Sequence, residues 1–145
     1  MRYIQRIMRP EAIFGPIGAL ALWTAGVVLL IGFRRLRAVR SGALSAGAFR
    51  FGESADVPPH VAVANRNYMN LLEMPLLFYV VGIALYVTHH VGRPEVVMAW
   101  LYVALRVVHS LIHLTTNHLG RRLTAFALSN FVLLAMWLRF LSDVL

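Results

Sequence analysis

The chain has 145 residues, of which 59% are hydrophobic and 14% are charged, and its mean hydropathy is +0.69. Soluble domains are about 45–50% apolar and about 25% charged, so this composition excludes an ordinary soluble domain or a disordered chain. All 14 basic residues are arginine, the net charge is +8, and there is no cysteine, which excludes a disulfide scaffold. Because most arginines flank or interrupt apolar runs, the charge indicates a membrane protein rather than a nucleic-acid-binding one.

Four apolar runs predict transmembrane helices in an all-α fold. The run 12–33 contains no charge and exceeds both the roughly 20 residues of a membrane span and the roughly 7–15 residues of a signal-peptide core. We therefore expect a retained span, followed by three more at 61–88, 96–114 and 123–141. The last two connections are short, which favours antiparallel neighbours. The sequence thus predicts one domain over residues 1–145, built as an up-down four-helix bundle.

The loop arginines predict an orientation in the membrane. The first and third loops contain seven arginines, and the opposite side contains five. Positively charged loops remain on the cytoplasmic side during insertion. We expect the first loop to be cytoplasmic and both termini to lie outside.

Polar side chains recur at helical spacing within the two middle spans. On the second span they are Arg66, Asn70 and Glu73. On the third span they are Arg106, His109 and His113, with Asn117 one further turn along. At 100° per residue each set falls on one helix face, within about 60° and about 80° respectively. Exposing such polar faces to lipid costs free energy, so we expect them to face each other inside the bundle.

The helical rise predicts which of these residues meet. Glu73 lies about 20 Å into the second helix and Arg106 about 18 Å into the third, measured from the same side at 1.5 Å per residue. We therefore expect a Glu73–Arg106 ion pair, and Arg66 level with His113. An ion pair that only sets helix register is the alternative. With Arg122 nearby, three arginines against one carboxylate favour an electropositive cleft for an anion, opening toward the first and third loops.

Other chemistries fit less well. His109 and His113 have the spacing of metal ligands, but the glutamate of the HExxH motif is missing and no cysteine completes a site, so we expect no metal. The remaining histidines lie at helix ends, which disfavours haem. Pro75 removes a backbone hydrogen bond just after Glu73 and is expected to kink the second helix.

The two polar faces resemble the MAPEG family, the membrane-associated proteins in eicosanoid and glutathione metabolism. One motif is R-x-x-x-N-x-x-E in the second helix, met by Arg66, Asn70 and Glu73. The other is R-x-x-H late in the third helix, met by Arg106 and His109 and followed by an arginine before the fourth helix. The resemblance covers most of the chain, and the RVVHSLIH version looks like the bacterial branch.

This resemblance implies a homotrimer in contact with membrane lipids, in the bacterial inner (plasma) membrane, with glutathione bound at the subunit interfaces. The implied contacts are Arg34 and Arg35 from a neighbouring subunit, together with Arg66, Asn70, Glu73, Arg106, His109 and His113. It further implies that Arg122 stabilises the glutathione thiolate, since a nearby cation favours the ionised thiol. A hydrophobic small-molecule substrate would enter from the bilayer.

The sequence also departs from the family pattern. His113 stands where glutathione-using relatives carry a tyrosine, Met69 where one branch has a second arginine, and Leu123 where that branch has a hydroxyl. We expect a glutathione-dependent transferase or peroxidase acting on hydrophobic electrophiles or lipid hydroperoxides. The alternatives are a non-catalytic module that binds a lipid headgroup or another anion in its cleft, and a small proton-coupled transporter.

Overall fold

The computed structural model describes residues 9–50 and 57–145, and these contain helices but no strands. In chain order the helical elements are η1 (Pro10–Ile13), α1 (Phe14–Arg40), η2 (Ala46–Phe49), α2 (Pro59–Leu72), α3 (Met74–Val87), α4 (Arg93–Leu114) and α5 (Leu119–Val144). Segments long and apolar enough to cross a membrane are Pro10–Arg40, Pro59–Val87, Arg93–Leu114 and Leu119–Val144. The predicted all-α fold with four membrane spans is confirmed.

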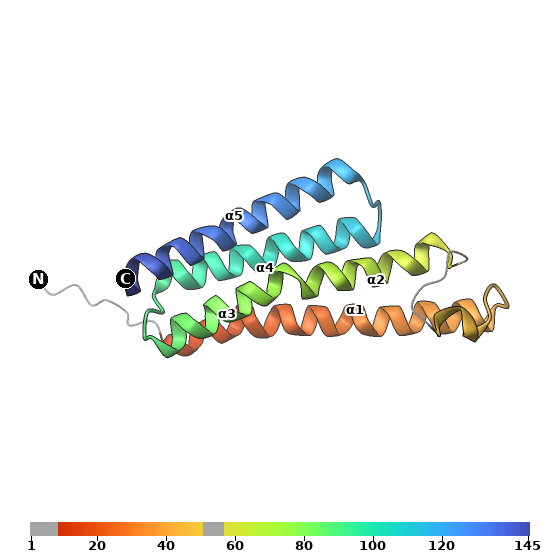
Figure 1. Cartoon of the computed structure of the whole chain (residues 1–145), viewed down its shortest axis with the longest axis horizontal. Coiled ribbons are helices and arrows are strands. Elements are labelled where there is room, and N and C mark those ends of the chain that lie inside the picture. Colours follow the sequence, from red (N-terminus) through yellow and green to blue (C-terminus); the bar gives the residue numbers. More distant parts are fainter. Residues whose placement is uncertain (1–8, 51–56) are drawn as a thin grey trace, which may run out of the picture.

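The spans run alternately up and down (Figure 1). The start of α1, the α3–α4 connection and the end of α5 lie at one end of the bundle. The α4–α5 connection and the start of α2 lie toward the other end, which we call the loop end. α1 packs against α2 and α4, whereas α5 packs against α4 and α3. In Figure 1, the ribbons of α5 and α2 diverge toward the loop end.

Helix α1 continues well past its apolar run, which ends at Phe33. Arginine is a good helix former, and Arg37 and Arg40 lie in the last turn, where cations interact favourably with the negative end of the helix dipole. The helix therefore extends beyond the expected hydrocarbon boundary and carries its arginines on ordered backbone.

The second span is broken at Glu73, whose backbone angles are φ −70° and ψ −88°. Pro75 occupies the first turn of α3, where its missing N–H is tolerated, and it cannot donate to the carbonyl oxygen of Leu71. The predicted kink is confirmed, and it separates α2 from α3 near the middle of the span.

The apolar core lies mainly toward the end of the bundle opposite the loop end, where α5 ends. Phe78 of α3 stacks on Tyr102 of α4 with ring centroids 4.6 Å apart, and Leu20 and Met136 are buried beside them. The outer surface is also apolar, with Leu22 of α1 75% exposed. Such a surface is suited to contact with lipid or another hydrophobic partner.

A buried polar contact joins three helices near the loop end. Ser110 of α4 accepts hydrogen bonds from Trp23 Nε1 of α1 at 2.9 Å and from Asn67 Nδ2 of α2 at 2.7 Å. Ser110 and Asn67 are both fully buried. Because buried polar groups need hydrogen-bond partners, these bonds hold α2 and α4 in a defined register.

Candidate functional site

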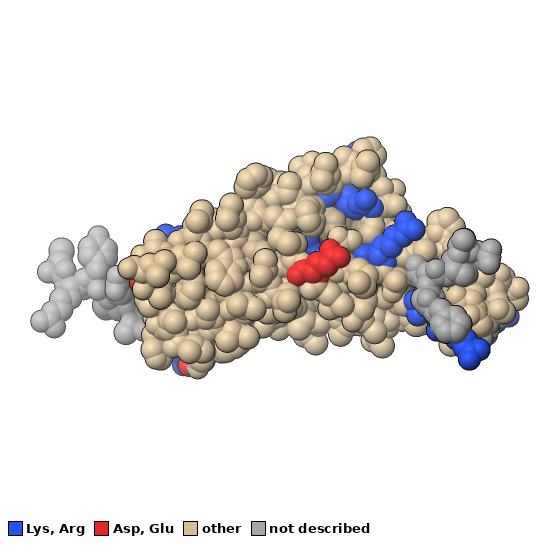
Figure 2. Space-filling view, viewed as in Figure 1, with Lys and Arg blue, Asp and Glu red and all other residues tan. Residues whose placement is uncertain are grey.

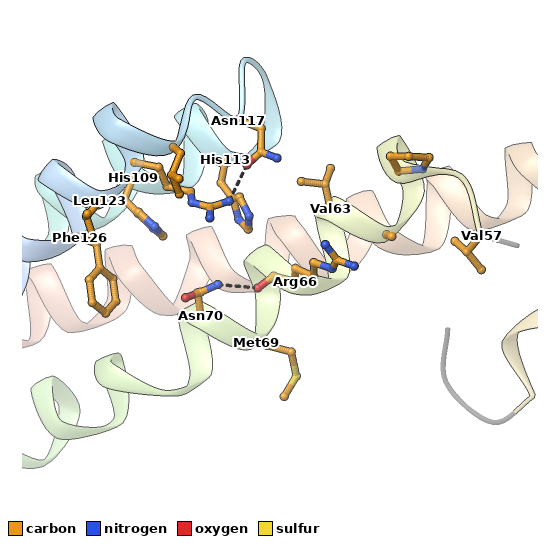
Figure 3. A pocket seen from close by; sticks show the side chains of 14 residues that line it. Val57, Val63, Arg66, Met69, Asn70, His109, His113, Asn117, Leu123 and Phe126 are labelled. Carbon is orange, nitrogen blue, oxygen red and sulfur yellow. Dashed lines mark hydrogen bonds between the residues drawn. The ribbon is translucent and has the colours of Figure 1, made fainter. Parts of the chain in front are cut away.

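A cleft of about 730 Å³ opens between α2 and the α4–α5 hairpin at the loop end. Its lining residues are Val57, Pro59, Ala62, Val63, Arg66, Met69, Asn70, His109, His113, Asn117, Leu119, Arg122, Leu123 and Phe126. Figure 3 shows the α2 side chains on one side of this cleft and those of α4 and α5 on the other. The predicted polar cleft toward the first- and third-loop side is therefore present.

The α2 side of the cleft contributes Arg66 and Asn70, one helical turn apart. Asn70 donates from Nδ2 to the carbonyl oxygen of Arg66 at 2.9 Å, which fixes the amide (Figure 3). The Arg66 side chain is exposed, and its guanidinium makes no hydrogen bond or ion pair with any described residue. Arg66 is thus a cation available to a ligand.

The α4 side contributes His109 and His113, which are 2% and 3% exposed. Their rings stack with centroids 5.9 Å apart, as expected for side chains one helical turn apart on the same face. The Nδ1 atoms of both rings are buried without a hydrogen-bond partner in the described part of the chain. Buried polar atoms are normally paired, so these two nitrogens are candidates for contact with a ligand.

Arg122 lies in the first turn of α5, because this helix begins at Leu119. Its Nη1 donates to Asn117 Oδ1 at 2.6 Å (Figure 3). Asn117 lies in the α4–α5 connection with φ +47°, a conformation that asparagine tolerates better than most residues. The loop therefore holds the Arg122 guanidinium at the edge of the cleft. Arg66 and Arg122 both line the cleft, and none of its described lining residues is acidic.

Arg106 lies beneath the cleft, fully buried and adjacent to Phe126, whose ring centroid is 5.7 Å from the guanidinium carbon. Its Nη2 donates to the main-chain carbonyl oxygen of Asn70. Its Nε and Nη1 atoms have no partner among the described residues. Arg106 is therefore positioned by the end of α2 and does not itself line the cleft.

The predicted ion pair between Glu73 and Arg106 is wrong. No salt bridge or hydrogen bond joins the two side chains, and Glu73 is exposed outside the cleft lining. The cause is the helix break, which ends α2 before Glu73 and leaves the Asn70 carbonyl oxygen available. The predicted depth of Arg106 along the second span was accurate to about one helical turn, because Arg106 contacts Asn70 instead of Glu73.

Arg34 and Arg35 do not line the cleft of their own chain. Arg34 Nη1 donates to the carbonyl oxygen of His60 at 2.6 Å. The Arg35 guanidinium lies over the Phe49 ring, 4.9 Å from its centroid. Arg34 therefore contacts the first turn of α2, and Arg35 contacts the connection between α1 and α2.

The sequence did not predict most of the apolar lining of the cleft, including Phe126, or the supporting residue Asn67. Phe126 forms part of the wall and covers Arg106, and its position four residues after Arg122 on a helix could have indicated this. Asn67 donates to Ser110, the residue next to His109 on α4, and only the three-dimensional structure brings Asn67 and Ser110 together. Figure 2 shows basic side chains on the face that carries this end of α2 and α4.

Comparison with protein-family models identifies the family of this chain. The model of the MAPEG family matches residues 13–142, nearly the whole chain. Searches of curated proteins and of solved structures found no match to this chain. With four spans and the two polar motifs on α2 and α4, the chain belongs to the MAPEG family.

Proposed function

We propose that the protein is a glutathione-dependent transferase or peroxidase acting on hydrophobic electrophiles or lipid hydroperoxides. The observation that carries this proposal is the cleft itself. Arg66 and Arg122 line it without a described acidic residue, and two buried histidine nitrogens there lack partners. Its volume falls within the range of about 300–1,000 Å³ that is usual for small-molecule sites. The cleft thus suits a small anionic ligand.

The residues present fit a peptide with two carboxylates and one amine, which is the chemistry of glutathione. The free guanidinium of Arg66 can bind a carboxylate through two parallel hydrogen bonds. Asn70 and the histidines offer further polar contacts at the same level. Glu73, outside the cleft lining, would be available to the amine of such a peptide. Arg106 would support the site by holding the end of α2.

Arg122 has the position proposed for the activating cation. When bound, glutathione would supply the thiol nucleophile. The Asn117 side chain orients Arg122 from the loop, so that its remaining guanidinium donors face the cleft margin. A cation held there would favour the ionised thiol and so increase the nucleophilic fraction.

The apolar part of the cleft supports a hydrophobic second substrate. Met69 of α2 and Leu119, Leu123 and Phe126 of α5 line it. Leu119 and Leu123 are 68% and 61% exposed, so this wall continues onto the outer surface of α5. A lipophilic compound could therefore approach from the bilayer.

We further propose a homotrimer in the bacterial inner membrane, with the first loop cytoplasmic and both termini outside. The exposed apolar face of α1 provides a surface for neighbouring subunits or lipids. In such a trimer, Arg34 and Arg35 would contribute to a neighbour's site. The orientation rests on the excess of arginines in the first and third loops.

The test uses the purified protein in mild detergent. We expect calorimetry to detect glutathione binding, and we expect conjugation of an aryl halide such as 1-chloro-2,4-dinitrobenzene. Absence of both would overturn the proposal. The competing function is a non-catalytic module that binds a lipid headgroup or another anion, favoured by His113 in place of the family tyrosine. Native mass spectrometry would support that function if a lipid were lost on Arg66→Gln but not on addition of glutathione.

A further inference from the structure

A second hollow, of about 460 Å³, lies on the loop end between the C-terminal part of α1 and the start of α2. The residues that line it include Leu30, Phe33, Arg34, Arg37, Ser41 and His60. None of these residues lines the cleft described above. The two sites are therefore separate in this chain.

The hollow spans the expected boundary between hydrocarbon and headgroups. The uncharged run of α1 ends at Phe33, which is 61% exposed, and Arg34 is the first charged residue after it. Arg37 lies one helical turn farther from the hydrocarbon than Phe33. The same hollow thus has apolar side chains on its membrane side and basic ones beyond it, at the level where lipid phosphates lie.

No described residue neutralises the charge in this hollow. Arg34 is held by its bond to the His60 carbonyl oxygen and retains further guanidinium donors. Arg37 is exposed, and its guanidinium makes no hydrogen bond or ion pair with a described residue. None of the described residues that line the hollow is acidic. Two guanidinium groups at this position match the oxygens of a phosphate, which they can bind with paired hydrogen bonds.

We propose that this hollow binds the phosphate of an anionic phospholipid. Arg34 and Arg37 contact the phosphate oxygens, and the acyl chains run along Leu30 and Phe33. Apolar residues on the membrane side favour a lipid over free phosphate, which has no acyl chain to use them. Arg34 is shared with the proposed trimer, in which it would reach a neighbour's glutathione. Arg37 is absent from the cleft and from every proposed glutathione contact, so a variant at Arg37 tests the lipid site by itself.

The test is lipid retention by the full-length protein in mild detergent, measured by native mass spectrometry. Phosphatidylglycerol and phosphatidylcholine are added in parallel. We expect wild-type protein to retain phosphatidylglycerol preferentially, and Arg37→Gln to bind it about fivefold more weakly, the usual effect of one basic residue near an anionic lipid. Arg40→Gln is the matched control, because it removes the same charge from the same helix end without touching the hollow. Equal retention by the two variants would overturn the proposal.

Two further arms identify the source of the anion and the state of the protein. Addition of orthophosphate should leave the bound lipid in place, and its displacement at micromolar concentration would overturn the assignment to a lipid. Thermal unfolding of both variants should match wild type, since both positions are exposed. Aryl halide conjugation measured on the same preparation separates the two proposals, because retained lipid without conjugation contradicts only the proposed enzymatic function.

Discussion

Arg106 of α4 donates a hydrogen bond to the main-chain carbonyl oxygen of Asn70, three residues before the break that separates α2 from α3. In a continuous helix this carbonyl would accept from Met74, but Met74 begins a new helix. A side chain from a neighbouring span therefore completes the backbone hydrogen bonding of the broken one. In membrane proteins, unpaired backbone groups within a span are costly, and neighbouring helices commonly satisfy them in this way.

The first prediction compares the two residues once expected to form an ion pair. Arg106→Ala should lower the free energy of unfolding by about 2 kcal/mol or more, because it leaves the Asn70 carbonyl oxygen unpaired within the span and opens a cavity where the buried side chain was. Glu73→Gln should change it by less than about 0.5 kcal/mol, because the carboxylate is exposed and unpaired. Thermal unfolding in detergent measures both. Equal destabilisation would instead indicate that the two side chains pair.

The second prediction concerns the contact among α1, α2 and α4. Ser110→Ala removes the acceptor used by Trp23 and Asn67 and should cost about 1–3 kcal/mol of stability, because it leaves the buried Asn67 amide without its acceptor. Ser129→Ala is the matched control. Ser129 is equally buried, but its hydroxyl donates only within α5, to the Phe126 carbonyl oxygen. Similar unfolding temperatures for the two variants would contradict the importance of the interhelical contact.

The third prediction concerns the opposite end of the bundle. Glu95 is 4% exposed, and its Oε1 is paired with Arg139 Nε at 3.0 Å and Nη2 at 2.9 Å. Arg139→Gln leaves a buried carboxylate without its cation and should cost about 1–2 kcal/mol, less than a fully buried pair because the arginine is half exposed. The amide of Gly92 still donates to Oε2. Arg93→Gln, also at this end but exposed, should leave the unfolding temperature unchanged.

The fourth prediction tests the proposed role of Arg122 and rests on the proposed function. If Arg122 lowers the thiol pKa by one unit, Arg122→Gln should reduce kcat/KM for aryl halide conjugation about tenfold at neutral pH. Loss of the cation raises the thiol pKa, so the rate should recover as the pH rises. Arg121→Gln is the control, because it removes a neighbouring exposed charge outside the cleft. An unchanged pH profile in Arg122→Gln would exclude this role.

Much of the fold followed from local rules. Apolar runs of spanning length predicted the four spans, and the position of Pro75 predicted the break. Helical periodicity also placed Arg66 and Asn70 on a face that meets His109 and His113 across the cleft. These predictions succeeded because they depend on rise and angle per residue, which are nearly constant along an unbroken helix.

The sequence by itself thus determined the class of protein, the number of spans and the two polar helix faces. The tertiary structure decided which atoms on those faces meet. Periodicity cannot cross the break at Glu73, because backbone angles of φ −70° and ψ −88° redirect every residue that follows relative to α2. Helical periodicity likewise cannot predict that Phe126 lies over Arg106 or that Arg34 donates to the His60 carbonyl oxygen. Those contacts depend on how separate helices and connections pack. Local geometry sets each helix face, whereas packing between helices selects its partners.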